Sequence, residues 1–345
     1  MRKTMRMRRK GFTLVELLVV IAIIALLMGL LMPALAKVRQ LAYRMVCGSS
    51  LSGIGKAMVL YAQDNDGDFP CAGGKISPTK KWSTQGYLGT GPGTGWDALT
   101  EAQAFPSGTN PTIGSCFYLL VKYADVGVKQ FVCKGDAGSQ VFKRSDYNPT
   151  NAKEDSDAWD FGRGPGKHCS YSYQMPFSWT TGCPIGSASF PISTTSNPAS
   201  PLCADRNPFL DKNAEGADKS AGGYVDGAIS STERAAYWDT LTSPAKYADP
   251  DKTENAAAHQ REGQNVLFCD ISARFELQAI CGISNDNIWK RWPACPPGNT
   301  DTQRQLGTLD TGGSATFTGG ATLGPMSEAD AFLVNEHQGT AQGPP

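Results

Sequence analysis

The sequence lacks most of the motifs by which enzymes and metal-binding domains are recognised. Histidine occurs only three times in 345 residues, and the motifs GxSxG, HExxH and the P-loop are absent. There is no CxxC pair, so the sequence encodes neither a zinc ribbon nor a CxxCH haem site. These absences argue against an enzyme, and we expect no catalytic residue, no bound metal and no cofactor.

Charge is also scarce, because only 19% of the residues are Asp, Glu, Lys or Arg, whereas Gly (38) and Pro (22) are plentiful. Such a composition is typical of a loop-rich, β-containing domain and not of a helical bundle. The 32 basic and 32 acidic residues balance overall. Six of the basic residues precede position 11 and no acid does, so the rest of the chain is net negative, which argues against nucleic acid as a partner.

A long apolar run follows this basic cluster. The 21 residues from Phe12 to Met32 can span a hydrocarbon core of about 30 Å as a helix. The positive-inside bias predicts a cytoplasmic N-terminus and an exported C-terminal part. A secretory signal peptide is the competing interpretation, since Met32–Ala36 loosely resembles a cleavage site, but its apolar core would be shorter.

The apolar run contains one charged residue, Glu16. A carboxylate inside a membrane costs roughly 2.5–3.5 kcal/mol on insertion scales, so Glu16 is expected to find a partner. That requirement points to assembly with other subunits, because a helix that only anchors a domain needs no such group.

The nonapeptide Lys10–Leu18, KGFTLVELL, resembles the processing motif of the prepilin family, which comprises type IV pilins and the pseudopilins of type II secretion. The resemblance implies cleavage between Gly11 and Phe12 by a prepilin peptidase and N-methylation of Phe12. It also implies that Glu16 pairs with the N-terminal amine of a neighbouring subunit. The implied partners are other pilin or pseudopilin subunits, the peptidase, an inner-membrane assembly platform and the membrane.

Further motifs are similar to those of a large group of pseudopilin-like proteins found in planctomycetes. They are the segments 47–51, 64–70, 131–136 (FVCKGD), 170–173 (SYSY) and 259–270. The last is similar to the His-to-Asp-Gly element of that group, and we expect His259 to hydrogen-bond Asp270 or the turn that carries it. Ile271 replaces the usual Gly, which predicts a turn of another type or a shifted turn, because a left-handed conformation is costly for Ile.

Ten cysteines follow the apolar run, all on the exported side of the predicted topology. An even number in an oxidising compartment favours disulfides, but the sequence does not determine their pairing. Cys47, which is close to the membrane, is expected to remain unpaired. Asp64, Asp66 and Asp68 suggest calcium, but Phe69 stands where an EF-hand loop needs Gly, so no motif supports a bound ion.

The predicted organisation has four parts: a leader over residues 1–11, a long helix over 12–62 (12–32 transmembrane), an exported domain over 63–297 and a mostly disordered Gly/Thr-rich tail over 298–345. The fold class is α+β and type IV pilin-like, a long helix packed on an antiparallel sheet with large loops. Predicted strands are 129–133, 169–173, 266–269 and 273–277; residues 116–123 fit strand or helix. Short helices are expected at 229–241 and 327–335.

These features predict a pseudopilin-like structural subunit of a periplasmic type II secretion pseudopilus, held in the inner membrane before assembly. One alternative is a type IV pilin of a surface filament for adhesion, motility or DNA uptake. Another is a membrane-anchored glycan-binding module, which clustered exposed tryptophans among the seven would favour.

Overall fold

The structure is a computed structural model of the whole chain. It describes residues 13–73, 95–105, 111–136, 138–146, 154–162, 165–174, 176, 192–208, 255–289, 327, 329–331 and 333–334. These residues divide into two compact units, Met1–Tyr43 and Arg44–Pro345. The predicted helix at 229–241 lies outside the described residues, as does most of the predicted tail.

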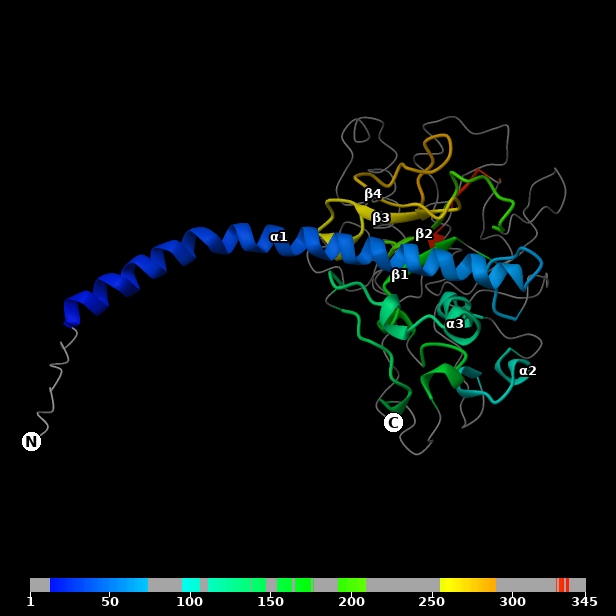
Figure 1. Cartoon of the computed structure of the whole chain (residues 1–345). Coiled ribbons are helices and arrows are strands. Elements are labelled where there is room, and N and C mark those ends of the chain that lie inside the picture. The colour runs from blue at the N-terminus through cyan, green and yellow to red at the C-terminus, as the bar shows by residue number, and fades with distance from the viewer. Residues whose placement is uncertain are drawn as a thin grey trace, which may run out of the picture. The chain divides into compact units, whose positions relative to one another are not determined.

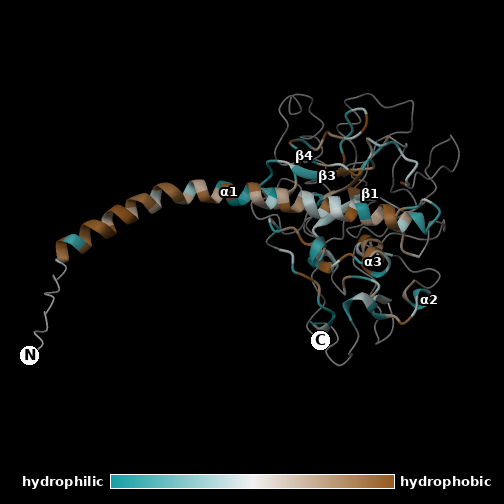
Figure 2. Ribbon diagram, viewed as in Figure 1, coloured by the Kyte–Doolittle hydropathy of each residue, from teal (hydrophilic) through white to brown (hydrophobic). Residues whose placement is uncertain are grey.

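A single helix, α1 (Leu14–Gln63), runs through both units and agrees with the predicted helix over 12–62 (Figure 1). Pro33 lies inside it without ending it. Apolar residues dominate the first half of α1, and its second half is mixed (Figure 2). In the second unit, α1 buries the stripe Cys47, Leu51, Ile54 and Met58, whose steps of three and four place these residues on one face.

The sheet has five strands in the order β4-β3-β2-β1-β5, and every pairing is antiparallel. Their bounds are β1 (Tyr171–Gln174), β2 (Pro201–Asp205), β3 (Gln264–Phe268), β4 (Ala273–Glu276) and β5 (Leu333–Val334). A long N-terminal apolar helix with a small antiparallel sheet is the α+β arrangement of type IV pilins, so the predicted fold class is confirmed.

Three of the strand predictions are confirmed with shifted ends, as β1, β3 and β4. The strand predicted at 129–133 is wrong, because Val128–Phe131 forms the 3-10 helix η2. Residues 116–123 belong to the helix α3 (Ile113–Tyr123), which starts with a capping box between Thr112 and Ser115. The other short helices are η1 (Gly95–Asp97), α2 (Glu101–Ala104), η3 (Arg144–Asp146), η4 (Asp155–Asp157), η5 (Pro165–Lys167) and η8 (Ala257–His259).

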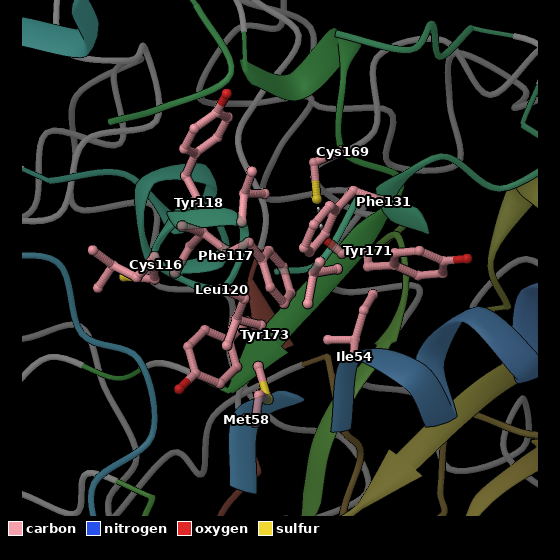
Figure 3. Close-up of a cluster of buried hydrophobic side chains, with 14 of the residues drawn as sticks. Ile54, Met58, Cys116, Phe117, Tyr118, Leu120, Phe131, Cys169, Tyr171 and Tyr173 are labelled. Carbon is pink, nitrogen blue, oxygen red and sulfur yellow. Dashed lines mark hydrogen bonds between the residues drawn. The ribbon is translucent and has the colours of Figure 1, made fainter. Parts of the chain in front are cut away.

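The main core lies between α1, α3 and the strands, and it is rich in aromatic rings (Figure 3). Phe117 of α3 packs against Tyr173 of β1, with ring centroids 5.4 Å apart, and against Phe131, at 5.5 Å. Ile54 and Met58 of α1 close the same cluster. This packing joins the second half of α1 to the sheet domain.

The described part of the predicted tail is ordered against the sheet. Leu333–Val334 pairs with β1, so the helix predicted at 327–335 is wrong. Asn207 Nδ2 donates to the Leu333 carbonyl at 2.9 Å, and the Ala331 amide donates to Asp286 Oδ2 at 2.6 Å. These bonds explain why an edge strand forms in a segment whose composition indicates disorder.

The β3–β4 hairpin departs from the sequence-based expectation at its turn. Ile271 has φ +64°, so the turn keeps the left-handed conformation although the usual Gly is absent. The Ile271 side chain is half-buried against the main core, next to Gly55 of α1. Packing of this side chain offsets the backbone strain that we expected to exclude the conformation.

Candidate functional site

The first turn of α1 carries the predicted assembly residue. The Glu16 carboxylate oxygen Oε2 accepts hydrogen bonds from the Thr13 amide at 2.9 Å and from the Thr13 hydroxyl at 2.7 Å. The Glu16 amide donates back to Thr13 Oγ1 at 3.3 Å, which completes a reciprocal capping box. Glu16 is thus held in the first turn of the helix, three residues after Thr13. The cleavage-site residues Gly11 and Phe12 lie outside the described residues.

The side chains that follow Glu16 are exposed. In the first unit, large apolar residues from Leu14 to Met32 have between about half and three quarters of their surface accessible, as for Val20 (45%) and Leu14 (76%). Among the described helices, α1 is the one that is long and apolar enough to cross a membrane, by length and composition. An apolar surface of this length needs lipid or other subunits to cover it.

A disulfide attaches α1 to the sheet domain. Cys47 of α1 bonds Cys133, 86 residues later, with 5.4 Å between the Cα atoms. The expectation that Cys47 stays unpaired is therefore wrong, because the turn after η2 brings Cys133 against the helix. Closing a loop of this length stabilises a fold by about 3–5 kcal/mol in the chain-entropy account.

His259, at the end of η8, lies against this disulfide and contacts the carboxylate of a residue that the sequence did not indicate. Its Nε2 is 3.1 Å from Asp205 Oδ2 at the end of β2, and 3.7 Å from Cys133 Sγ. Asn265 completes the cluster: its backbone and side-chain amides donate to the same Asp205 oxygen at 2.6 and 3.1 Å. All of these side chains are buried.

The contacts of Asp270 differ from the predicted pairing with His259. Asp270 Oδ1 accepts from the Ser272 amide at 2.8 Å and from its hydroxyl at 2.5 Å, and Oδ2 lies 3.2 Å from Arg274. Asp270 therefore braces the exposed hairpin turn, and these hydrogen bonds hold its pKa below the usual range. The carboxylate that faces His259 belongs to Asp205, on a strand that the sequence reasoning missed.

Several of the motifs that are scattered in the sequence meet here. The Ser170 amide donates to the Phe131 carbonyl at 2.7 Å, and the Ser170 hydroxyl donates to Asp136 Oδ2 at 2.9 Å. Asp136 also pairs with the buried Arg206 at 3.3 Å. The segments 47–51, 131–136, 170–173 and 259–270 thus surround one end of the sheet, where they hold α1 in place.

The described tryptophans do not form an exposed sugar-binding face. Trp96 and Trp159 are each 5% exposed, and Trp289 is fully buried. Trp159 Nε1 donates to the Ala98 carbonyl at 3.1 Å, as expected for a core indole. Trp82, Trp179, Trp238 and Trp292 lie outside the described residues. In the described part of the chain, tryptophan gives the glycan-binding alternative no support.

Comparison with known proteins identifies the N-terminal segment. Residues 6–32 match the family model of the prokaryotic N-terminal methylation motif. No curated protein and no solved structure matches the chain. The match covers Gly11, Phe12 and Glu16, and together with the long apolar helix and the antiparallel sheet it supports a prepilin-type protein, of the kind that type IV pilins and pseudopilins represent.

Proposed function

We propose that the chain is a pseudopilin-like structural subunit of a periplasmic type II secretion pseudopilus. A prepilin peptidase cuts between Gly11 and Phe12, the new amine is methylated, and the subunit waits in the inner membrane with its C-terminal domain in the periplasm. An assembly platform then inserts it into the filament. Its mechanism is polymerisation and not turnover.

The observation that carries this proposal is the combination of the methylation motif with an exposed apolar helix that carries Glu16 in its first turn. The capping box keeps the Glu16 carboxylate next to the helix N-terminus, where the amine of a processed chain would be. When subunits stack, that carboxylate meets the amine of a neighbour, and each charge offsets the desolvation of the other. The exposed apolar residues of α1 then bury one another in the filament.

The sheet domain fits this role through its attachment to α1. The disulfide, the Ile54 and Met58 contacts and the ion pair of Arg44 with Glu262 hold the second half of the helix to the domain. Force applied along α1 during assembly is therefore transmitted to the domain through a covalent bond as well as through packing.

Co-purification of differently tagged full-length copies after cross-linking in native membranes tests the assembly claim. We expect Glu16→Ala to reduce cross-linked oligomers severalfold while the chain stays in the membrane. Asp270→Asn, which removes an exposed carboxylate elsewhere, should leave them unchanged. Undiminished oligomers for Glu16→Ala would contradict the proposal.

Labelling of intact cells separates the pseudopilus from a surface pilus, the alternative that shares the same N-terminal motif. A pseudopilin should be protected from external protease and antibody, and its loss should block export of secreted proteins. Exposure on intact cells would favour the pilin.

A further inference from the structure

The cluster around the disulfide contains four metal-ligating side chains. One donor atom from each of Cys47, Cys133, Asp205 and His259 lies within 4.8 Å of the others. These residues come from α1, the turn after η2, the end of β2 and the end of η8. Their exposed fractions are 0%, 1%, 0% and 4%, so the cluster is shielded from bulk water.

This set of donors is the kind that Zn²⁺ prefers, with two thiolates, one imidazole and one carboxylate. A tetrahedral zinc with bonds of about 2.0–2.3 Å separates its ligand atoms by about 3.3–3.8 Å. His259 Nε2 is 3.7 Å from Cys133 Sγ and 3.1 Å from Asp205 Oδ2, so these two pairs already lie close to that spacing. The two sulfurs, which are bonded to each other, separate to it when the disulfide is reduced.

Asp205 supplies a second, independent sign of a ligand. Its Oδ2 receives both amides of Asn265, but its Oδ1 is buried without a hydrogen-bond partner among the described residues. A buried carboxylate oxygen without a donor is costly, and a cation removes that cost. The Asn265 bonds would fix the carboxylate as the outer shell of a metal site does.

The backbone is built to let these segments approach one another. A Cβ at Gly135 would overlap the Ala258 carbonyl oxygen and stand 3.3 Å from His259 Nδ1. A Cβ at Gly48, next to Cys47, would be 3.1 Å from Asn265 Oδ1. Glycines at both positions therefore let His259 and Asn265 come close to the segments that carry the two sulfurs.

We propose that these four residues form a Zn²⁺ site in the dithiol form of the chain, and that closure of the Cys47–Cys133 disulfide replaces the ion. On the proposed topology, the chain leaves the cytosol with its thiols reduced, so the folded dithiol form exists between export of the domain and its oxidation. On binding, the two thiols release two protons and both sulfurs coordinate the ion as thiolates. On oxidation, the two thiolates transfer two electrons to a disulfide-exchange oxidant, the S–S bond forms and Zn²⁺ leaves. In either form, α1 is fastened to the sheet domain at the same point.

Cobalt binding to full-length protein in detergent tests the site, with the disulfide either intact or reduced by a phosphine. In the reduction, the phosphine takes the oxygen of water to become a phosphine oxide, and the two sulfurs gain two electrons and the two protons. After the phosphine is removed, the dithiol chain should bind one Co²⁺, with the charge-transfer absorption of two thiolates and tetrahedral visible bands. Zn²⁺ should displace it, and the disulfide form should show no such spectrum.

Variants show whether the spectrum comes from these residues. Cys47→Ser/Cys133→Ser should abolish it, and His259→Gln and Asp205→Asn should each weaken affinity about tenfold or more, at least the loss seen for outer-shell residues. Asp270→Asn and Cys281→Ser are the matched controls and should bind as the wild type does. An unchanged spectrum in the double cysteine variant would overturn the proposal, as would the absence of binding by the dithiol wild type.

Alkylation of the wild-type dithiol chain gives a readout that needs no variant to fold. Zn²⁺ should slow modification of Cys47 and Cys133 at least severalfold, measured by peptide mass spectrometry, and leave Cys281 unaffected. If zinc leaves the modification rates of Cys47 and Cys133 unchanged, the result would contradict the site.

Discussion

Leu267 of β3 lies directly against Gly55 of α1: both of its terminal methyl carbons are 2.9 Å from the position that a Cβ on Gly55 would occupy. Ile271 Cγ2 is 3.2 Å from the same position. The helix therefore approaches the β3–β4 hairpin as closely as a residue without a side chain allows. This contact sets the distance between the second half of α1 and the sheet.

Replacement of Gly55 should therefore destabilise the domain. We expect Gly55→Ala to cost about 1–3 kcal/mol of unfolding free energy through overpacking, reduced by the better helix propensity of Ala. Gly53→Ala is the matched control, because its Cβ meets only the end of the exposed Gln130 side chain at 3.3 Å. That variant should gain roughly 0.5–1 kcal/mol. Denaturant unfolding of the full chain checks both, and equal stabilisation by the two substitutions would contradict the close contact.

Because Ile271 is left-handed, a glycine at this position should give a more stable protein than an alanine. Both Ile271→Gly and Ile271→Ala lose the packing next to Gly55, but only Gly relieves the strain at φ +64°. We expect Ile271→Gly to be more stable than Ile271→Ala by about 1 kcal/mol, whereas Ala is the more stable residue in regular structure. Thermal melting of the two variants measures the difference. If the Ala variant melts higher, the hairpin turn does not have this conformation.

The buried His168 predicts a loss of stability in mild acid. Burial lowers the pKa of His168, and although the Gln140 carbonyl 2.9 Å from Nδ1 opposes this effect, the net shift is downward. The unfolded chain therefore takes up a proton near pH 6.5 before the folded chain does. Unfolding free energy should fall as the pH drops from about 6.5 towards the folded pKa, by at most about 1.4 kcal/mol per pH unit from this group.

The comparison of two variants isolates this proton. His168→Asn keeps an amide near Nδ1 and should flatten the slope below pH 6.5. Phe142→Leu, which alters the ring packed against His168 at 5.5 Å, should lower stability without changing the slope. An unchanged slope in His168→Asn would assign the acid sensitivity to another group.

The sequence predicts those parts of the fold that local patterns encode. Apolar residues at steps of three and four predict the helix stripe at Leu51, Ile54 and Met58, and alternation predicts the β3–β4 hairpin. The nonapeptide Lys10–Leu18 identifies the N-terminal segment without any structural information, because a processing motif is a linear sequence.

Features that depend on distant parts of the chain were not predictable in this way. β2 is five residues long and starts with Pro201, so no periodicity marks it, and the partner of His259 at its end was missed. Cys133 meets Cys47 only because η2 and the helix pack together. The possible metal ligands were overlooked for the same reason, since no short spacing connects Cys47, Asp205 and His259.

The most direct test of the account is the N-terminus of the protein in native membranes. Intact mass and N-terminal sequencing of the wild type should give a chain that starts at N-methylated Phe12, and Gly11→Ala should retain the basic leader. A wild-type chain that starts near Ala34 or beyond would mean an ordinary signal peptide and a free exported domain, and it would contradict the filament subunit that we propose.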